Sequence, residues 1–276
     1  MLRLVLALVA SALVSLAAPA AAQDRIPSHC VALSQVPGVQ YLHRASWAEP
    51  IASDTVRIGY VDHAMFYLRT PGGLTAMTDF TGFFGNVDLI PDVVTMNNAH
   101  STHWTAFPDP AIPHVLEGWA DADGPRDHSL DLGEMLVRNV HTDVRSGGGL
   151  QVRENGNSIF VFEVAGLCIG HLGHLHHEPD AAQYAALGRV DVVMVAVDGG
   201  LTLDHDTVVR IMERLRASVV IPMHWFGRGT LDRFVVRMEE AGFAVERPGG
   251  SDLVLSLTSL PAQPTVIVLE PALLSD

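Results

Sequence analysis

Histidine follows directly after three apolar runs of this chain, and aspartate follows a fourth. The residues are His100 and His103 after the run 92–96, His171, His174, His176 and His177 after 167–169, His224 after 218–223, and Asp198 after 191–197. Neutral imidazole is the commonest metal ligand in proteins, and binding sites are often built where the strands of a layered sheet end. The distribution of histidine therefore predicts a metalloprotein.

Spacing and burial decide which of these histidines could share one ion. His100 and His103 are three residues apart in a loop, so both imidazoles could reach the same ion. Such a pair is more often structural when it stands alone, but the clusters at the other strand ends favour ligation. His224 follows a buried strand, and its burial without a partner would be costly. The group 171–177 holds more imidazoles than one ion can use, and we expect His176 to be the exposed one.

An all-imidazole site would leave a divalent cation its full positive charge. Zinc held by three histidines can lower the pKa of a bound water to about 7. Zn²⁺ is therefore the first candidate, although imidazole also suits copper, nickel and iron. Asp198 could accept a proton or supply a carboxylate to the ion, and capping of the turn at Gly199 and Gly200 explains it equally well.

The elements that must position these side chains form a β-rich first half and an alternating second half. The expected strands of the first half are 55–60, 64–69, 74–78, 92–96, 114–116 and the hairpin 158–164 with 167–169. An irregular segment at 105–130 and a Gly-rich loop at 145–157 interrupt them. The second half is expected to run helix 179–188, strand 191–197, helix 204–216, strand 218–223, helix 231–241 and strand 253–257. This order favours a layered α/β sandwich in a single domain, residues 23–276.

The N-terminus has the pattern of a secretory signal peptide. Arg3 precedes the apolar run 4–19, and small residues lead to Ala22 before the chain turns polar. We expect residues 1–22 to be removed and the protein to be periplasmic or secreted. No later apolar stretch is long enough to span a bilayer, so we expect no stable membrane anchor after cleavage.

Charge and missing motifs reduce the range of possible functions. The formal net charge of −14 disfavours nucleic acid as a partner, because an acidic surface repels phosphate backbones. The sequence contains no G-x-S-x-G elbow, phosphate-binding Gly loop or C-x-x-C. A small-molecule substrate is the expected partner. An exported protein could pair Cys30 with Cys168, but a bridge requires the N-terminal region to meet an apolar strand, and we expect two free thiols.

Four segments of the chain resemble metallo-β-lactamase-fold hydrolases, in the broad branch similar to ascorbate-lactonase-type proteins. They are RIGYVDHAMFYLRTPGGLTAMTDF, VVTMNNAHSTH, HLGHLHH and VIPMHW, and the likeness spans roughly residues 57–242. The resemblance implies a four-layer αββα sandwich. It also places Asp79 at a turn behind the metal ligands, and it carries His100, His103 and His224 over as ligands.

The likeness is broken at three positions of the metal motif. Asn98 stands where the leading histidine belongs, Thr102 where an aspartate belongs, and His174 where the family has its metal-bridging aspartate. His141 is the one candidate for the remaining histidine ligand. Because an imidazole cannot bridge two ions as a carboxylate does, we expect one Zn²⁺ rather than two. The expected ligands are His100, His103, His174 and His224, and the positioning residues or alternative ligands are Asp79, Asn98, Thr102, His141, His171 and His177.

Together these patterns predict an exported metal-dependent hydrolase. A metal-bound hydroxide would attack an ester, lactone, amide or phosphoester, with Asp198 as the catalytic carboxylate. The loss of family carboxylates leaves an alternative open, in which the fold is a catalytically weakened periplasmic module that binds metal or a small ligand.

Overall fold

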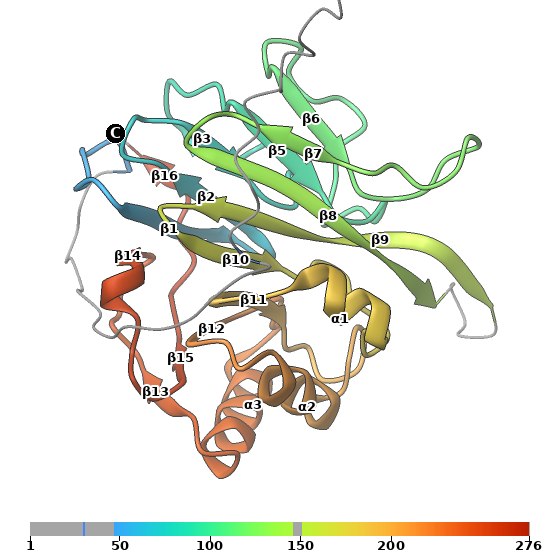
Figure 1. The fold of residues 1–276 in the computed structure, drawn as a ribbon, viewed down its shortest axis with the longest axis vertical. Coiled ribbons are helices and arrows are strands. Elements are labelled where there is room, and N and C mark those ends of the chain that lie inside the picture. Colours follow the sequence, from blue (N-terminus) through green and yellow to red (C-terminus); the bar gives the residue numbers. More distant parts are fainter. Residues whose placement is uncertain (1–29, 31–46, 146–150, 276) are drawn as a thin grey trace, which may run out of the picture.

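Two large β-sheets dominate the computed structural model, which describes residue 30 and residues 47–145 and 151–275 (Figure 1). One sheet has six strands in the order β14-β1-β2-β3-β5-β6, and the other has eight in the order β13-β15-β12-β11-β10-β9-β8-β7. Strands β16 (Leu274–Ser275) and β4 (Gly85–Asn86) pair separately. The expected signal peptide, residues 1–22, lies outside the described residues.

The six-stranded sheet carries the first part of the chain. Its strands are β1 (Thr55–Asp62), β2 (Met65–Arg69), β3 (Thr75–Met77), β5 (Val93–Met96), β6 (His114–Glu117) and β14 (Asp252–Ser256). Nearly every residue of β1, β2, β3 and β5 is buried, since both faces of this sheet are covered. The buried runs explain why continuous apolar stretches, rather than alternating ones, predicted these strands.

The eight-stranded sheet contains the long hairpin and the parallel strands of the second half. Its members are β7 (Ser129–Asp131), β8 (Met135–Arg145), β9 (Val152–Val164), β10 (Leu167–His171), β11 (Val192–Ala196), β12 (Val219–Met223), β13 (Ala244–Glu246) and β15 (Thr265–Ile267). Strands β10, β11 and β12 run parallel. Their carboxyl ends therefore meet at one edge, where the loops with His174, Asp198 and His224 begin.

The two sheets pack face to face, and helices cover the second sheet. Phe66 of β2 and Phe160 of β9 belong to one core cluster between the sheets. Helices α1 (Ala181–Leu187), α2 (His205–Leu215) and α3 (Arg228–Glu240) place Leu187, Ile211 and Phe234 against the outer face of the eight-stranded sheet (Figure 1). A 3₁₀ turn spans Leu257–Ser259.

The predicted α/β sandwich is confirmed. In the described part of the chain, loops and a short strand pair cover the outer face of the six-stranded sheet. Its outer face is covered by a third apolar cluster that includes Phe80, Ile112 and Trp119 from loops and Leu274 from β16. Among the described residues the three α-helices all belong to the other side. The second outer layer is thus built from loops and a short strand pair. No helix in the described part of the chain is long and apolar enough to cross a membrane.

Three local predictions were wrong. Residues 152–157, expected in a loop, form the first half of β9, and its partner β8 was not predicted at all. Helix α1 starts at Ala181 rather than at Pro179, because the Asp180 side chain accepts from Gln183 N and the Gln183 side chain bonds back to Asp180 N, which closes a capping box.

The expectation of two free thiols was also wrong. Cys30 and Cys168 form a disulfide, with Cα atoms 5.6 Å apart. The backbone supports the contact, since Arg189 N donates to Cys30 O over 2.6 Å. The bridge fastens the N-terminal region to β10, three residues before that strand ends at His171.

Candidate metal centre

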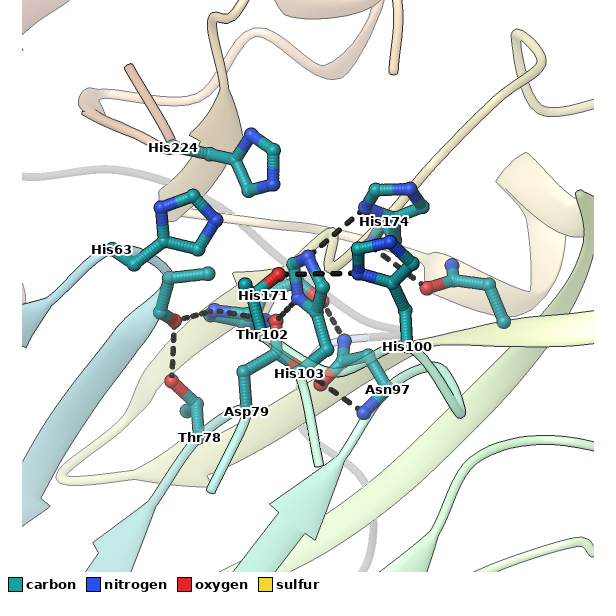
Figure 2. Close-up of polar contacts among 12 residues, drawn as sticks. His63, Thr78, Asp79, Asn97, His100, Thr102, His103, His171, His174 and His224 are labelled. Carbon is teal, nitrogen blue, oxygen red and sulfur yellow. Dashed lines mark hydrogen bonds and ion pairs between the residues drawn. The ribbon is translucent and has the colours of Figure 1, made fainter. Parts of the chain in front are cut away.

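Imidazoles from four separate loops meet at the carboxyl edge of the sheets. His63 lies between β1 and β2, His103 follows β5, His174 follows β10, and His224 follows β12 (Figure 2). Their side chains point toward one another. One nitrogen each of His63, His103 and His224 can be chosen so that all three atoms lie within 4.8 Å of one another.

A buried carboxylate orients His103. The Nδ1 atom of His103 lies 2.5 Å from Oδ2 of Asp79, and neither residue is exposed to solvent. Asp79 also accepts a hydrogen bond from Asn97 N at Oδ1 over 2.9 Å. When Nδ1 donates to the ionised carboxylate, the Nε2 lone pair of His103 is left facing the cluster. Carboxylates behind metal-binding histidines commonly set the tautomer in this way.

A second carboxylate stands behind His224. Its Nδ1 lies 3.0 Å from Oδ2 of Asp198. Both ring nitrogens are buried; Nδ1 makes this ion-pair contact with Asp198, and Nε2 has no hydrogen-bond partner among the residues that the structure describes. The backbone places the ring by a left-handed conformation at His224, φ 57°, and by a hydrogen bond from His224 N to His63 O over 2.8 Å. An orphaned, buried imidazole nitrogen is costly without a ligand.

His63 is the functional residue that the sequence analysis missed. It sits in a left-handed turn, φ 42°, between β1 and β2, and its carbonyl accepts from the Tyr60 hydroxyl over 2.6 Å. Its ring centroid is 4.0 Å from that of His224, and its Nε2 is buried without a partner in the described part of the chain. The signal that marked the other histidines, a position just past a buried strand, could also have identified His63.

Two of the expected ligands lie beside this trio rather than within it. His174 Nδ1 is 3.0 Å from His103 Nε2, so His174 is close enough to join a site centred on His103. His100 is exposed, stacks on His174 with ring centroids 5.0 Å apart, and bonds to the Thr102 hydroxyl over 3.2 Å. Thr102 thus contacts a histidine at the edge of the cluster.

The remaining sequence candidates serve other contacts. Asn98 is buried and pairs with Asn157 across a β-bridge. His171 Nε2 donates to Ala64 O over 2.8 Å. His141 lies on β8, where it contacts Asp127 and Ser158, and the described contacts do not bring it to the cluster. His177 is exposed.

His176, expected to be exposed, is instead half-buried. It packs against His174 with ring centroids 4.7 Å apart. Burial and the nearby Arg145 lower the pKa of His176 to about 4.

Burial keeps His63, His103 and His174 neutral. Burial, and then His224, lowers the pKa of His63 to about 3. Burial, and then His103, lowers the pKa of His174 to about 2. Burial also holds the pKa of His103 well below its ordinary value. Because a metal ligand must offer an unprotonated nitrogen, these environments favour ligation at neutral pH.

The two carboxylates differ in their surroundings. Burial raises the pKa of Asp79 to about 7, although His171 and the Asn97 N–H oppose the rise. Burial would likewise raise the pKa of Asp198, but hydrogen bonds from His224 and from Thr202 outweigh it and bring that pKa below its ordinary value. Asp198 also accepts from the backbone N–H groups of Gly200 and Leu201. The carboxyl therefore caps a turn while it holds His224; its predicted role as proton acceptor stays a prediction.

The donor set fits a divalent cation. Three imidazoles converge, two of their Nε2 atoms are buried without partners among the described residues, and two carboxylates stand behind them. Three histidines are a known ligand set for zinc, and imidazole also suits copper, nickel and iron. Among the described residues, the group of side chains that could hold an ion contains three histidines and no carboxylate that would bridge two ions.

Known proteins are similar to this chain in sequence and fold. A UPF0173 metal-dependent hydrolase of Methanospirillum hungatei is 23% identical over 206 residues, which cover 68% of this chain and 89% of that protein. A structure from Thermotoga maritima, assigned to the Zn-dependent hydrolases of the metallo-β-lactamase superfamily, has a TM-score of 0.55 and 26% identity, and the match covers 78% of this chain and 98% of that one.

The fold is shared more widely than the sequence. The metallo hydrolase Igni18 of Ignicoccus hospitalis has a TM-score of 0.53 at only 16% identity, covering 79% of this chain and 96% of that one. The model of the β-lactamase superfamily domain matches residues 57–224, from β1 through His224. That span includes every histidine of the cluster, and the chain belongs to the β-lactamase superfamily domain family.

Proposed function

We propose that the protein is an exported metal-dependent hydrolase of small molecules with one divalent ion, zinc first among the candidates, held by His63, His103 and His224. The observation that carries the proposal is the convergence of their three nitrogens within 4.8 Å. His174, whose Nδ1 is 3.0 Å from His103 Nε2, is the candidate fourth ligand. Esters, lactones, amides and phosphoesters are the substrate classes proposed.

The ion would supply a Lewis acid and a nucleophilic water at neutral pH. The work of the chain is to hold the imidazoles in one tautomer. Asp79 keeps the proton of His103 on Nδ1, and Asp198 does the same for His224, so that both Nε2 lone pairs stay available. The low pKa values of His63 and His174 prevent protonation from competing with ligation.

An exposed aromatic ring adjoins the cluster on its open side. Phe226 is 67% exposed, and its ring centroid lies 5.4 Å from that of His63 and 5.3 Å from that of His224. A large apolar ring exposed next to candidate ligands offers a surface for the apolar part of a substrate. This placement favours an ester, lactone or amide with an apolar group near the scissile bond.

A binding module is the second candidate, and the contacts of Asp198 favour it. That carboxyl is occupied by backbone N–H groups, the Thr202 hydroxyl and His224. Such a group is a poor proton acceptor, so the described site lacks an evident general base. In this reading the protein would hold metal or a small ligand without turnover.

Turnover separates the two candidates. The purified protein would be tested against ester, lactone, amide and phosphodiester substrates before and after chelation, and after restoration of zinc. Many turnovers per chain that disappear with chelation and in His103→Ala, and that return with zinc, are expected. Metal-dependent ligand binding with no more than one turnover per chain would favour the binding module.

Export rests on separate observations. The N-terminal signal pattern and the disulfide both fit an oxidising compartment. N-terminal sequencing of the protein recovered outside the cytoplasm is expected to start at Gln23. A full-length chain confined to the cytoplasm would refute export and leave the hydrolase proposal standing.

A further inference from the structure

A small pocket lies beside His176, whose ring packs on His174 at the metal centre. It has a volume of about 270 Å³ and is lined mainly by the last residue of β8, the loops after β10 and β11 and helix α2, among them Arg145, His176 and Arg210. Pockets that hold whole drug-sized ligands measure roughly 300–1,000 Å³. This pocket therefore suits one functional group of a larger molecule. The ring of His176 lies between the pocket and the metal centre, because this ring packs on His174.

The hydrogen bonding of His176 determines its tautomer. Its Nδ1 accepts from the backbone N–H of Arg145 over 2.8 Å. Because that nitrogen uses its lone pair as an acceptor, the neutral ring carries its proton on Nε2. His176 Nε2 is buried and has no hydrogen-bond partner among the described residues. It cannot ligate a metal in this form, and it leaves an N–H donor for an acceptor that the protein does not supply.

Arg145 brings a positive charge to the same pocket. Its Nη2 donates to the carbonyl oxygens of Gly200, Leu201 and Thr202. No carboxylate within the described ranges forms an ion pair with it, and its described side-chain bonds use only Nη2. The guanidinium therefore retains N–H donors on Nη1 and Nε.

The other charged residues of the pocket, Glu178, Asp204 and Arg210, sum to −1, and each of them already has a partner. Arg210 is paired with Glu178 over 3.4 Å. Asp204 also lines the pocket, but its carboxyl is occupied by the Thr207 backbone N–H and hydroxyl, which it accepts as the cap of α2. The unbalanced donors are those of Arg145 and His176. A guanidinium with an adjacent N–H is the donor set that binds carboxylate and phosphate oxygens.

We propose that this pocket is a subsite for an oxyanion, so that the substrate carries a carboxylate or phosphate group beside the bond that is cleaved. This proposal rests on the proposed function. Because the pocket lies near His174, an anion in it would belong to a substrate bound at the metal centre. The binding of an anion here does not itself require turnover. The two claims can therefore fail separately.

Equilibrium binding tests the subsite directly. Inorganic phosphate and, in a parallel series, acetate are titrated calorimetrically into the protein as purified, at constant ionic strength in chloride. The variants are Arg145→Gln, which removes the unpaired charge, and Arg210→Gln, which lines the pocket but anchors none of the carbonyls of residues 200–202. Arg228→Gln is the matched control, because Arg228, the first residue of α3, is paired with Glu270 and lies outside the pocket.

We expect Arg145→Gln to weaken binding of at least one anion about tenfold or more, the loss typical of a charged hydrogen bond, while Arg228→Gln leaves it unchanged. Arg210→Gln is expected to have a smaller effect than Arg145→Gln. Preference for acetate or for phosphate identifies which group the substrate carries. No binding of either anion to the wild type, or a loss below about threefold in Arg145→Gln, would overturn the proposal.

A metal-bound anion is excluded by the same titration in His224→Ala. Phosphate binding that persists in this variant and still depends on Arg145 places the anion in the pocket. Binding that disappears in His224→Ala but is unchanged in Arg145→Gln places it on the ion and overturns the subsite. If phosphate binds the pocket yet no substrate is hydrolysed, the proposed function fails while the subsite stands.

Discussion

Replacement of Asp79 by asparagine tests how the fold prepares His103 for a metal. The change keeps the size of the side chain, and Asn97 N is expected to go on donating to the oxygen at the Oδ1 position. The new NH₂ group then faces His103 Nδ1, which at present lies 2.5 Å from Oδ2. Because the amide donates where the carboxylate accepted, His103 must carry its proton on Nε2. That tautomer has no lone pair for an ion in the cluster.

The structure allows the size of the effect to be worked out. Loss of a carboxylate behind a metal-bound histidine typically costs about 10–100-fold in affinity, equivalent to about 1.4–2.8 kcal/mol. The metal-free protein should respond differently. Burial raises the pKa of Asp79 from 3.8 to about 7. A protonated Asp79 is therefore compatible with the fold, and that stability is lost as pH rises through the folded-state pKa. At pH 8 the ionised carboxyl destabilises the fold by about 4 kcal/mol relative to the protonated one. Removal of the charge offsets the lost hydrogen bonds.

Zinc affinity measured by competition with a chelator, together with urea denaturation of the metal-free protein at pH 8, checks both parts. We expect Asp79→Asn to bind zinc about 10–100-fold more weakly than wild type without a loss of metal-free stability. Asp92→Asn is the control, since Asp92 accepts from Thr75 N and Oγ1 at the start of β5, away from the cluster. Equal zinc affinity in Asp79→Asn and wild type would refute the role assigned to Asp79.

Three further predictions concern the disulfide, pH and the exposed ring. The disulfide closes a sequence separation of 138 residues, so Cys30→Ser/Cys168→Ser should lose up to about 5 kcal/mol of unfolding free energy; urea midpoints that match those of the oxidised wild type would contradict this. Burial lowers the pKa of His103 in the folded state. Below the ordinary histidine pKa of 6.5, the unfolded chain therefore binds more protons than the folded one, and the metal-free protein should lose stability from pH 6.5 downward. Flat stability between pH 6.5 and 5 would argue against buried neutral imidazoles. Phe226→Ala should raise KM for apolar esters with unchanged metal content; loss of the metal instead would mean that the ring supports the ligands rather than the substrate.

Burial on both faces made much of the fold predictable. Strands β5, β11 and β12 are short apolar runs with every residue buried, and such runs are recognisable without knowledge of their neighbours. Strand β8 is not of this kind, since its buried and half-exposed residues alternate irregularly. The start of β9 reads as a loop because Asn155 and Gly156 are turn residues. Pairing with β8, which continues past a register shift between Thr142 and Val144, makes it a strand.

The metal site was only partly predictable for a related reason. His103 and His224 follow apolar strands, and that position marked them. His63 follows Asp62 in a tight turn, and its part in the cluster depends on a hydrogen bond from His224 N to its carbonyl, which joins residues 161 positions apart in the chain. The disulfide depends likewise on where the N-terminal region meets β10. The place of His63 directly after β1 is a local signal, but contacts of this range leave no local pattern that shows which side chains meet.

The central claim is that His63, His103 and His224 hold one divalent ion. Elemental mass spectrometry of the purified protein tests it most directly, with His63→Ala beside His141→Ala, a histidine whose described contacts are Asp127 and Ser158. The account predicts about one zinc per chain in wild type and His141→Ala, and none in His63→Ala. Metal retained in His63→Ala but lost in His100→Ala would contradict it and restore the ligand set expected from the sequence.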